Sequence, residues 1–141
     1  LSWALSGHKQ AIKKGALPLP AFVQEDLKSI ELPQLTYYGH TANLDMLERS
    51  ASSGLINGLF DSDGKLRRVA LLSVYEGNVY ESLALTLWRT TLPAHTLKLG
   101  PTVEADDAYK HVEFIEINFF NSSKDVKKYS FKAKIANSFC L

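Results

Sequence analysis

The densest group of chemically useful side chains is the acidic turn Asp61-Ser62-Asp63-Gly64 and the two arginines that follow it, Arg67 and Arg68. Two carboxylates one residue apart are also how a calcium-binding loop begins, but that loop needs a bidentate glutamate at its twelfth position. Counted from Asp61, the twelfth residue is Leu72, whose side chain carries no oxygen. The spacing therefore favours a tight turn over a metal loop, and we expect neither a metal nor a cofactor.

The arginine pair offers a second kind of chemistry, which is anion binding. Arg67 and Arg68 are neighbours on an expected strand, and neighbouring strand residues point to opposite faces of a sheet. One guanidinium must then turn toward the more buried side, where it needs a carboxylate or carbonyl partner. Two interpretations stay open. The inward arginine pairs with Asp61 or Asp63 and clamps the turn, or it faces a pocket and takes an anionic ligand.

Histidines are the usual candidates for acid–base catalysis, and a hydrolytic site could assemble from residues that are distant in sequence. The residues available for such a site are spread along the chain: His40, His95, Asp61, Asp63 and Asp106. The sequence contains no Gly-x-Ser-x-Gly elbow, no phosphate-binding glycine loop and no His-x-x-x-His pair. A small hydrolase is therefore kept only as an alternative function.

Composition sets the class of protein that must position these side chains. The chain has 141 residues, enough for one domain with a real core, and 45% apolar and 22% charged residues are ordinary for a globular protein. A net charge of +1 provides no field that would attract nucleic acid, so we expect no nucleic-acid partner. The single cysteine, Cys140, cannot form an intrachain disulfide.

The pattern of apolar residues predicts an α/β (mixed α+β) domain, with a mixed or largely antiparallel sheet, a β-hairpin meander and packed helices. Helices are expected at residues 3–14, 24–30, 44–52 and 83–92. Strands are expected at residues 55–60, 65–75, 79–80, 111–120 and 129–135, and residues 16–22 are expected to be extended. Turns are expected at residues 61–64, 76–78 and 121–125, and a loop at residues 101–108.

Several details of these elements can be compared with a structure. Thr41 or Asn43 is expected to cap the helix at 44–52, and Ser82 the helix at 83–92. The residues expected on one face of the latter helix are Leu83, Ala84, Leu87, Trp88 and Thr91. The residues 111–120 are apolar on both faces, which predicts a central strand. Five aromatic residues could line a ligand cleft, although core packing is favoured for most of them: Tyr75, Tyr80, Trp88, Tyr109 and Tyr129.

Residues 54–72 carry the pattern on which a family assignment depends. They read Gly-Leu-Ile-Asn-Gly-Leu-Phe-Asp-Ser-Asp-Gly-Lys-Leu-Arg-Arg-Val-Ala-Leu-Leu, and residues 80–85 read Tyr-Glu-Ser-Leu-Ala-Leu. These two segments resemble the CHASE2 sensory module, in which Asp-x-Asp-Gly, two arginines and an apolar strand precede a Tyr-Pro-Ser-Leu-Ala-Leu helix start. Weaker likeness extends to residue 135. Ala70 and Glu81 depart from the family pattern, which has proline at both places.

The resemblance implies that residues 1–141 form a single CHASE2-like domain, the latter part of the module, with the likeness strongest over 54–92. Such modules are extracytoplasmic, in the periplasm or at the cell surface, and they sense a ligand or stimulus for a bacterial receptor anchored in the inner membrane. The output would be a histidine kinase, an adenylate or diguanylate cyclase or a Ser/Thr kinase elsewhere in the parent protein, so this chain itself would not be an enzyme.

The site expected from the resemblance and the charge pattern together is the group Asp61, Asp63, Arg67 and Arg68, acting as a ligand site or as a structural clamp. The expected partners are an unidentified small ligand or stimulus and a second copy of the parent receptor. A dimerisation or partner-docking module without a small ligand remains the alternative of the binding class.

Overall fold

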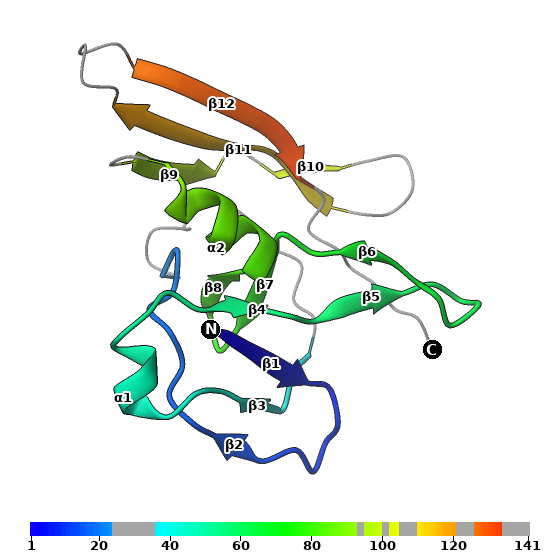
Figure 1. Ribbon diagram of the computed structural model, residues 1–141. Coiled ribbons are helices and arrows are strands. Elements are labelled where there is room, and N and C mark those ends of the chain that lie inside the picture. The colour runs from blue at the N-terminus through cyan, green and yellow to red at the C-terminus, as the bar shows by residue number, and fades with distance from the viewer. Residues whose placement is uncertain (24–35, 93–94, 100–101, 105–109, 121–125, 134–141) are drawn as a thin grey trace.

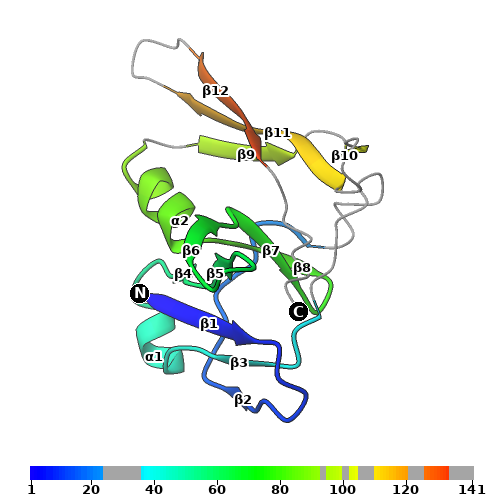
Figure 2. The same ribbon diagram turned by 90° about the vertical axis from the view of Figure 1, so that its right-hand side faces the viewer.

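The computed structural model describes residues 1–23, 36–92, 95–99, 102–104, 110–120 and 126–133. This part of the chain has an α+β fold in which parallel and antiparallel strands combine with short helices, as the sequence predicted. The expected helix at 24–30 and turn at 121–125 lie outside the described residues, as do Asp106, Tyr109 and Cys140. Figures 1 and 2 show α2 between a C-terminal sheet and the N-terminal half of the molecule.

Four short strands form the N-terminal sheet in the order β2-β3-β1-β4: β1 (Ser2–Ser6), β2 (Lys13–Lys14), β3 (Gly39–Thr41) and β4 (Gly54–Leu55). β1 lies antiparallel to β3 and parallel to β4. The helix predicted at 3–14 is therefore wrong. Trp3 and Leu5 are buried at a spacing of two, the period of a strand, whereas Ile12 of the supposed helical face is exposed.

The helix expected at 44–52 is a single turn, α1 (Asp45–Glu48), and this prediction was wrong in length. Its N-cap is Leu44, whose side chain cannot accept a hydrogen bond, and none of its residues is buried. Asn43 does not cap the helix but donates a hydrogen bond from Nδ2 to Glu48 Oε2 over 2.8 Å. Without a side-chain cap or a buried face, a second turn gains too little to offset its ordering cost.

Two hairpins follow, formed by β5 (Gly58–Phe60) with β6 (Leu66–Val69) and by β7 (Leu72–Tyr75) with β8 (Asn78–Glu81). The turn predicted at 61–64 is confirmed, since the Gly64 N–H donates to the Asp61 carbonyl over 2.8 Å. The turn at 76–78 is also confirmed, with positive φ at both Glu76 and Gly77, as in the type I′ turns that match strand twist.

The strands expected at 55–60 and 65–75 are each divided in two, because side chains and bends interrupt them. Asn57 leaves the ladder and bonds the backbone of Leu5 instead, accepting its N–H at 2.7 Å and donating to its carbonyl at 2.8 Å. Asn57 thereby joins the first hairpin to β1.

Helix α2 (Leu83–Thr90) begins where the sequence predicted, and Ser82 Oγ accepts the Leu85 N–H over 3.3 Å. The buried residues of α2 are Leu85 and Thr86, which the sequence did not place on the apolar face, while Leu87 of that face is more than half exposed. The first residues of the helix pack directly against Gly54, where an added Cβ would lie 2.4 Å from Leu83 Cα. This close contact with β4 sets the orientation of the helix.

The C-terminal sheet contains β9 (His95–Leu99), β10 (Thr102–Glu104), β11 (Lys110–Phe120) and β12 (Val126–Ala133). β11 pairs with β12 along one edge and with β9 and β10 along the other, so its predicted central position is confirmed. The strand predicted at 129–135 is confirmed over residues 129–133. The loop predicted at residues 101–108 is wrong at residues 102–104, which form strand β10.

A core cluster joins the N-terminal sheet to the second hairpin through five buried side chains: Trp3, Leu5, Leu55, Tyr75 and Tyr80. The Trp3 and Tyr80 rings meet edge to face, with centroids 5.0 Å apart. Core packing is thus confirmed for Tyr75 and Tyr80. No helix of the described residues has the length and apolarity needed to cross a membrane.

Candidate functional site

The structure brings Arg67 to both carboxylates of the acidic turn. Arg67 Nη1 donates to Asp61 Oδ2 and Asp63 Oδ1, each over 2.9 Å, and Nη2 donates to Asp63 Oδ2 over 2.8 Å. The hydrogen bonds from Arg67, and then from the Lys65 N–H, hold the pKa of Asp63 below its ordinary value. These bonds close the turn at the end of the first hairpin.

This ion pair is on the surface, so Arg67 is not the arginine that the sequence predicted to turn inward. The Arg67 side chain is 49% exposed. Arg67 is the extra residue where the β5–β6 register shifts, since Leu59 pairs with Arg68 but Phe60 pairs with Leu66. A bulged residue leaves the regular alternation of faces, so the argument from strand alternation does not hold for it. The backbone of Arg68 pairs with Leu59; its side chain is outside the described atoms.

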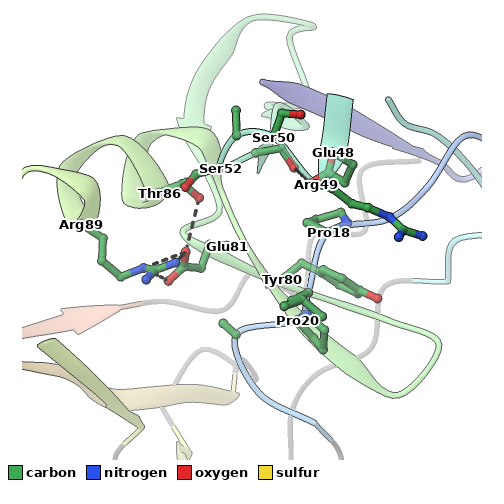
Figure 3. A pocket seen from close by; sticks show the side chains of 14 residues that line it. Pro18, Pro20, Glu48, Arg49, Ser50, Ser52, Tyr80, Glu81, Thr86 and Arg89 are labelled. Carbon is green, nitrogen blue, oxygen red and sulfur yellow. Dashed lines mark hydrogen bonds and ion pairs between the residues drawn. The ribbon is translucent and has the colours of Figure 1, made fainter. Parts of the chain in front are cut away.

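A cleft of about 740 Å³ lies away from this turn, where α1, β8 and α2 meet the extended segment after β2. Its lining is mostly polar and comes from four parts of the chain: Pro18, Leu19, Pro20, Ala21, Glu48, Arg49, Ser50, Ala51, Ser52, Ser53, Tyr80, Glu81, Thr86 and Arg89. In Figure 3, Glu81, Thr86 and Arg89 gather on one side, and Ser52 is labelled beside Thr86. Glu48, Arg49 and Pro18 lie across from them. The volume is in the range of small-molecule sites.

A buried ion pair forms one side of the cleft. Glu81, at the end of β8, is only 7% exposed, and the Arg89 side chain from the last turn of α2 is 31% exposed. Arg89 Nε lies 2.8 Å from Glu81 Oε1 and 3.0 Å from Oε2, and Nη2 donates to Oε2 over 2.8 Å. Thr86 Oγ1 donates to the same Oε2 over 3.3 Å. These contacts therefore tie the end of β8 to the middle and to the last turn of α2.

The opposite side of the cleft follows directly after α1. Glu48 is fixed by two donors, since Asn43 Nδ2 bonds its Oε2 and Ser53 Oγ bonds its Oε1. The Ser52 carbonyl accepts a hydrogen bond from the amino group of Leu1 over 2.9 Å. These bonds hold the serine-rich segment 50–53 beside β1 and along the cleft. Two of its hydroxyl groups already donate hydrogen bonds, Ser50 Oγ to the Met46 carbonyl over 2.7 Å and Ser53 Oγ to Glu48.

The extended segment 16–22, confirmed as such, forms the rim of the cleft. The Ala21 N–H donates to the Val79 carbonyl over 2.8 Å, and the Val79 N–H donates to the Phe22 carbonyl over 2.9 Å. Pro18 and Pro20 have no N–H to donate, so they fit a segment that pairs with β8 only at its end. They add apolar surface next to Tyr80.

The histidine of the hydrolase alternative, His40, occupies a structural position. It is buried, with Nδ1 3.2 Å from Tyr75 Oη and Nε2 3.3 Å from the Gly15 carbonyl oxygen. Both ring nitrogens thus contact groups of the core, and Gly15 has the positive φ that brings its backbone close. The side chain of His95 and all of Asp106 lie outside the description.

Sequence reasoning missed the cleft. Glu81 was noticed only as a departure from a family proline, and Arg89 was not noticed at all. The predicted helix at 44–52 included Ser50 and Ser52, but α1 ends at Glu48, before both of them. One pattern could have indicated the ion pair: a glutamate just before a helix N-cap and an arginine in the last turn of that helix.

Comparisons of this chain with protein-family models, with curated proteins and with solved structures returned no match.

Proposed function

We propose that this chain is a ligand-binding sensory domain and that the cleft between α1 and α2 is its binding site. The observation that carries the proposal is the cleft itself, a mostly polar hollow of about 740 Å³ whose lining includes the serine-rich segment 50–53 and the Glu81–Arg89 pair. Polar groups that converge on a concave site with an apolar rim are typical of small-molecule binding.

The lining indicates the class of ligand. The residues that line the cleft include charges of both signs, Glu48 and Glu81 with Arg49 and Arg89, so neither sign is favoured overall. The serine hydroxyls both donate and accept hydrogen bonds. A small neutral or zwitterionic molecule with several polar groups, such as a polyol, a sugar or an amino acid, satisfies this lining better than a polyanion or a polycation.

A bound molecule would contact several segments of the fold at once. The segment after α1 is held to β1, whereas Glu81 and Arg89 belong to β8 and α2. A ligand that prefers one spacing of these elements shifts the population toward it, and α2 leads directly into the C-terminal sheet. This is the kind of coupling that an input domain needs.

The resemblance of residues 54–72 and 80–85 to CHASE2 modules supports the cellular part of the proposal. On that basis the domain is extracytoplasmic and belongs to a membrane-anchored bacterial receptor, whose catalytic output is elsewhere. The Arg67 clamp then has a structural role at the hairpin turn, and we assign no catalytic residue to this chain.

Thermal shift measurements test the proposal with named probes. Neutral sugars and polyols and zwitterionic amino acids form the test panel, with dicarboxylates and polyamines for comparison. We expect at least one neutral or zwitterionic probe to raise the melting temperature of the wild type but not of Ser52→Tyr, which fills the cleft. Ser62→Tyr, an exposed serine in the hairpin turn, is the matched control and should respond like the wild type. A panel without any response contradicts the proposal.

A further inference from the structure

The rim of the cleft includes a short strap, residues 17–20, that hydrogen bonds fix at both ends. At one end the Ala16 N–H donates to the Asn43 carbonyl over 2.8 Å, and at the other the Ala21 N–H donates to the Val79 carbonyl over 2.8 Å. Within the described residues, the backbone of the strap itself takes part in no backbone hydrogen bond. Its middle can therefore shift toward the cleft without breaking any such bond.

Leu19 is the exposed apolar side chain of this strap. It is 95% exposed, more than any other large apolar side chain in the described part of the chain. Leu17, two residues earlier, packs against the core cluster. Residues two apart in an extended chain point to the same side, so the strap leaves the core between these two leucines, where it borders the cleft. A molecule held in the cleft can thus cover Leu19.

The chain also places opposite charges beside the strap. Figure 3 shows Glu48 and Arg49 on the same side of the cleft as Pro18. Arg49 Nη2 lies 2.9 Å from Asp45 Oδ2, but both side chains are largely exposed, so the pair is weak and a ligand carboxylate can replace it. The Glu48 carboxylate accepts two hydrogen bonds from neighbouring side chains and keeps lone pairs for a further donor.

We propose that the cleft binds a zwitterionic amino acid with an apolar side chain, and that Leu19 covers this side chain when the strap closes over it. The inference rests on the proposed function, because it names the ligand class of the same cleft. The ammonium group of the ligand faces Glu48, its carboxylate faces Arg49, and its side chain lies against Leu19 and the prolines of the strap. A polyol leaves Leu19 in water, and an uncharged aliphatic molecule gains nothing from the two charges.

The apolar contact should decide the preference among amino acids. Burying a leucine side chain that starts almost fully exposed strengthens binding by about tenfold to a hundredfold. Glycine carries the same two charged groups without an apolar side chain, so it should bind at least about tenfold more weakly than L-leucine or L-phenylalanine. 3-Methylbutylamine, which is leucine without its carboxylate, should lose a similar factor because it cannot pair with Arg49.

Calorimetric titration of the full chain with these four compounds and with glucose tests the proposal. We expect L-leucine or L-phenylalanine to bind most tightly, and the Kd of that amino acid to rise at least about fivefold in Leu19→Ala. The Tm of the free variant should not fall, because the exposed side chain has almost no contacts to lose. Leu44→Ala, at an exposed leucine outside the cleft lining, is the matched control and should leave the Kd unchanged.

The outcomes separate this inference from the proposed function. If glycine or glucose binds as tightly as the apolar amino acids, and Ser52→Tyr abolishes that binding, the cleft is a binding site but this inference is overturned. An unchanged Kd in Leu19→Ala overturns the covering role of the strap in the same way. Equal binding of L-leucine and 3-methylbutylamine overturns the recognition of a zwitterion. A chain that binds no small polar molecule at all overturns both proposals.

Discussion

Replacing Arg89 by methionine separates the buried ion pair of the cleft from the exposed one of the hairpin. The substitution keeps most of the aliphatic volume and removes the guanidinium, which leaves the Glu81 carboxylate with Thr86 Oγ1 as its remaining side-chain donor within the described residues. Because Glu81 is almost completely buried, water cannot replace the lost donors. Arg67→Met removes an equally charged group from a pair that solvent already surrounds.

The expected loss of stability in Arg89→Met follows from how deeply the Glu81–Arg89 pair is buried. Removing one partner of a fully buried pair costs about 3–5 kcal/mol, and the partial exposure of Arg89 reduces this to roughly 2–3 kcal/mol for Arg89→Met. For a chain of this size the loss corresponds to a fall in Tm of roughly 6–12 °C. Surface pairs contribute little, so Arg67→Met should change the Tm by less than about 2 °C.

Urea unfolding followed by circular dichroism gives the free energies of the single variants and of a double variant. Glu81→Met together with Arg89→Met removes both charges, and we expect it to be more stable than Arg89→Met alone, because no unpaired charge stays buried. The reasoning is refuted if Arg89→Met and Arg67→Met unfold at the same urea concentration, or if the double variant is less stable than Arg89→Met by the full cost of a second independent loss.

Two further predictions concern backbone contact and alkaline pH. Gly54→Ala should destabilise the protein by about 2–3 kcal/mol, because its Cβ would lie 2.4 Å from Leu83 Cα, and urea unfolding measures this. Gly64→Ala is the comparison, since it has open space and only an unfavourable φ, and it should cost roughly 1 kcal/mol; equal costs would contradict the packing of α2 on β4. Burial, and then the charge of Glu76, raises the pKa of Tyr80. The stability from its neutral phenol is complete below about pH 10 and is lost as the pH rises through the folded pKa. From about pH 10 upward, the Tm of Tyr80→Phe should therefore fall less than the Tm of the wild type, and parallel falls would count against this cause.

The fold was predictable where local chemistry decides it. The turns at 61–64 and 76–78 follow from aspartate, asparagine and glycine, and the start of α2 follows from Ser82. The first strand was missed because a run of five residues, in which only Trp3 and Leu5 alternate as buried side chains, is too short for its pattern to decide between strand and helix. Only pairing with β3 and β4, which are distant in sequence, selects the strand.

The candidate site shows the same division between local and distant contacts. The contact of Arg67 with Asp61 and Asp63 could be foreseen, since all three are within seven residues of one another. The exposure of Arg67 could not be foreseen, because an alternating sequence pattern does not reveal a β-bulge. The cleft collects residues from four segments, and Glu81 becomes a buried partner of Arg89 only after α2 has packed on Gly54.

The central claim is that the cleft binds a small neutral or zwitterionic molecule, and amide chemical shifts test it most directly. A ¹⁵N-labelled sample is titrated with each sugar, polyol and amino acid that raises the Tm, or with the whole panel if none does. We expect saturable shifts at residues 50–53, 79–82 and 86–89, and none of them in Ser52→Tyr. Saturable shifts confined to residues 61–69 would place binding at the arginine clamp instead, and that result, or the absence of any saturable shift, would contradict the account.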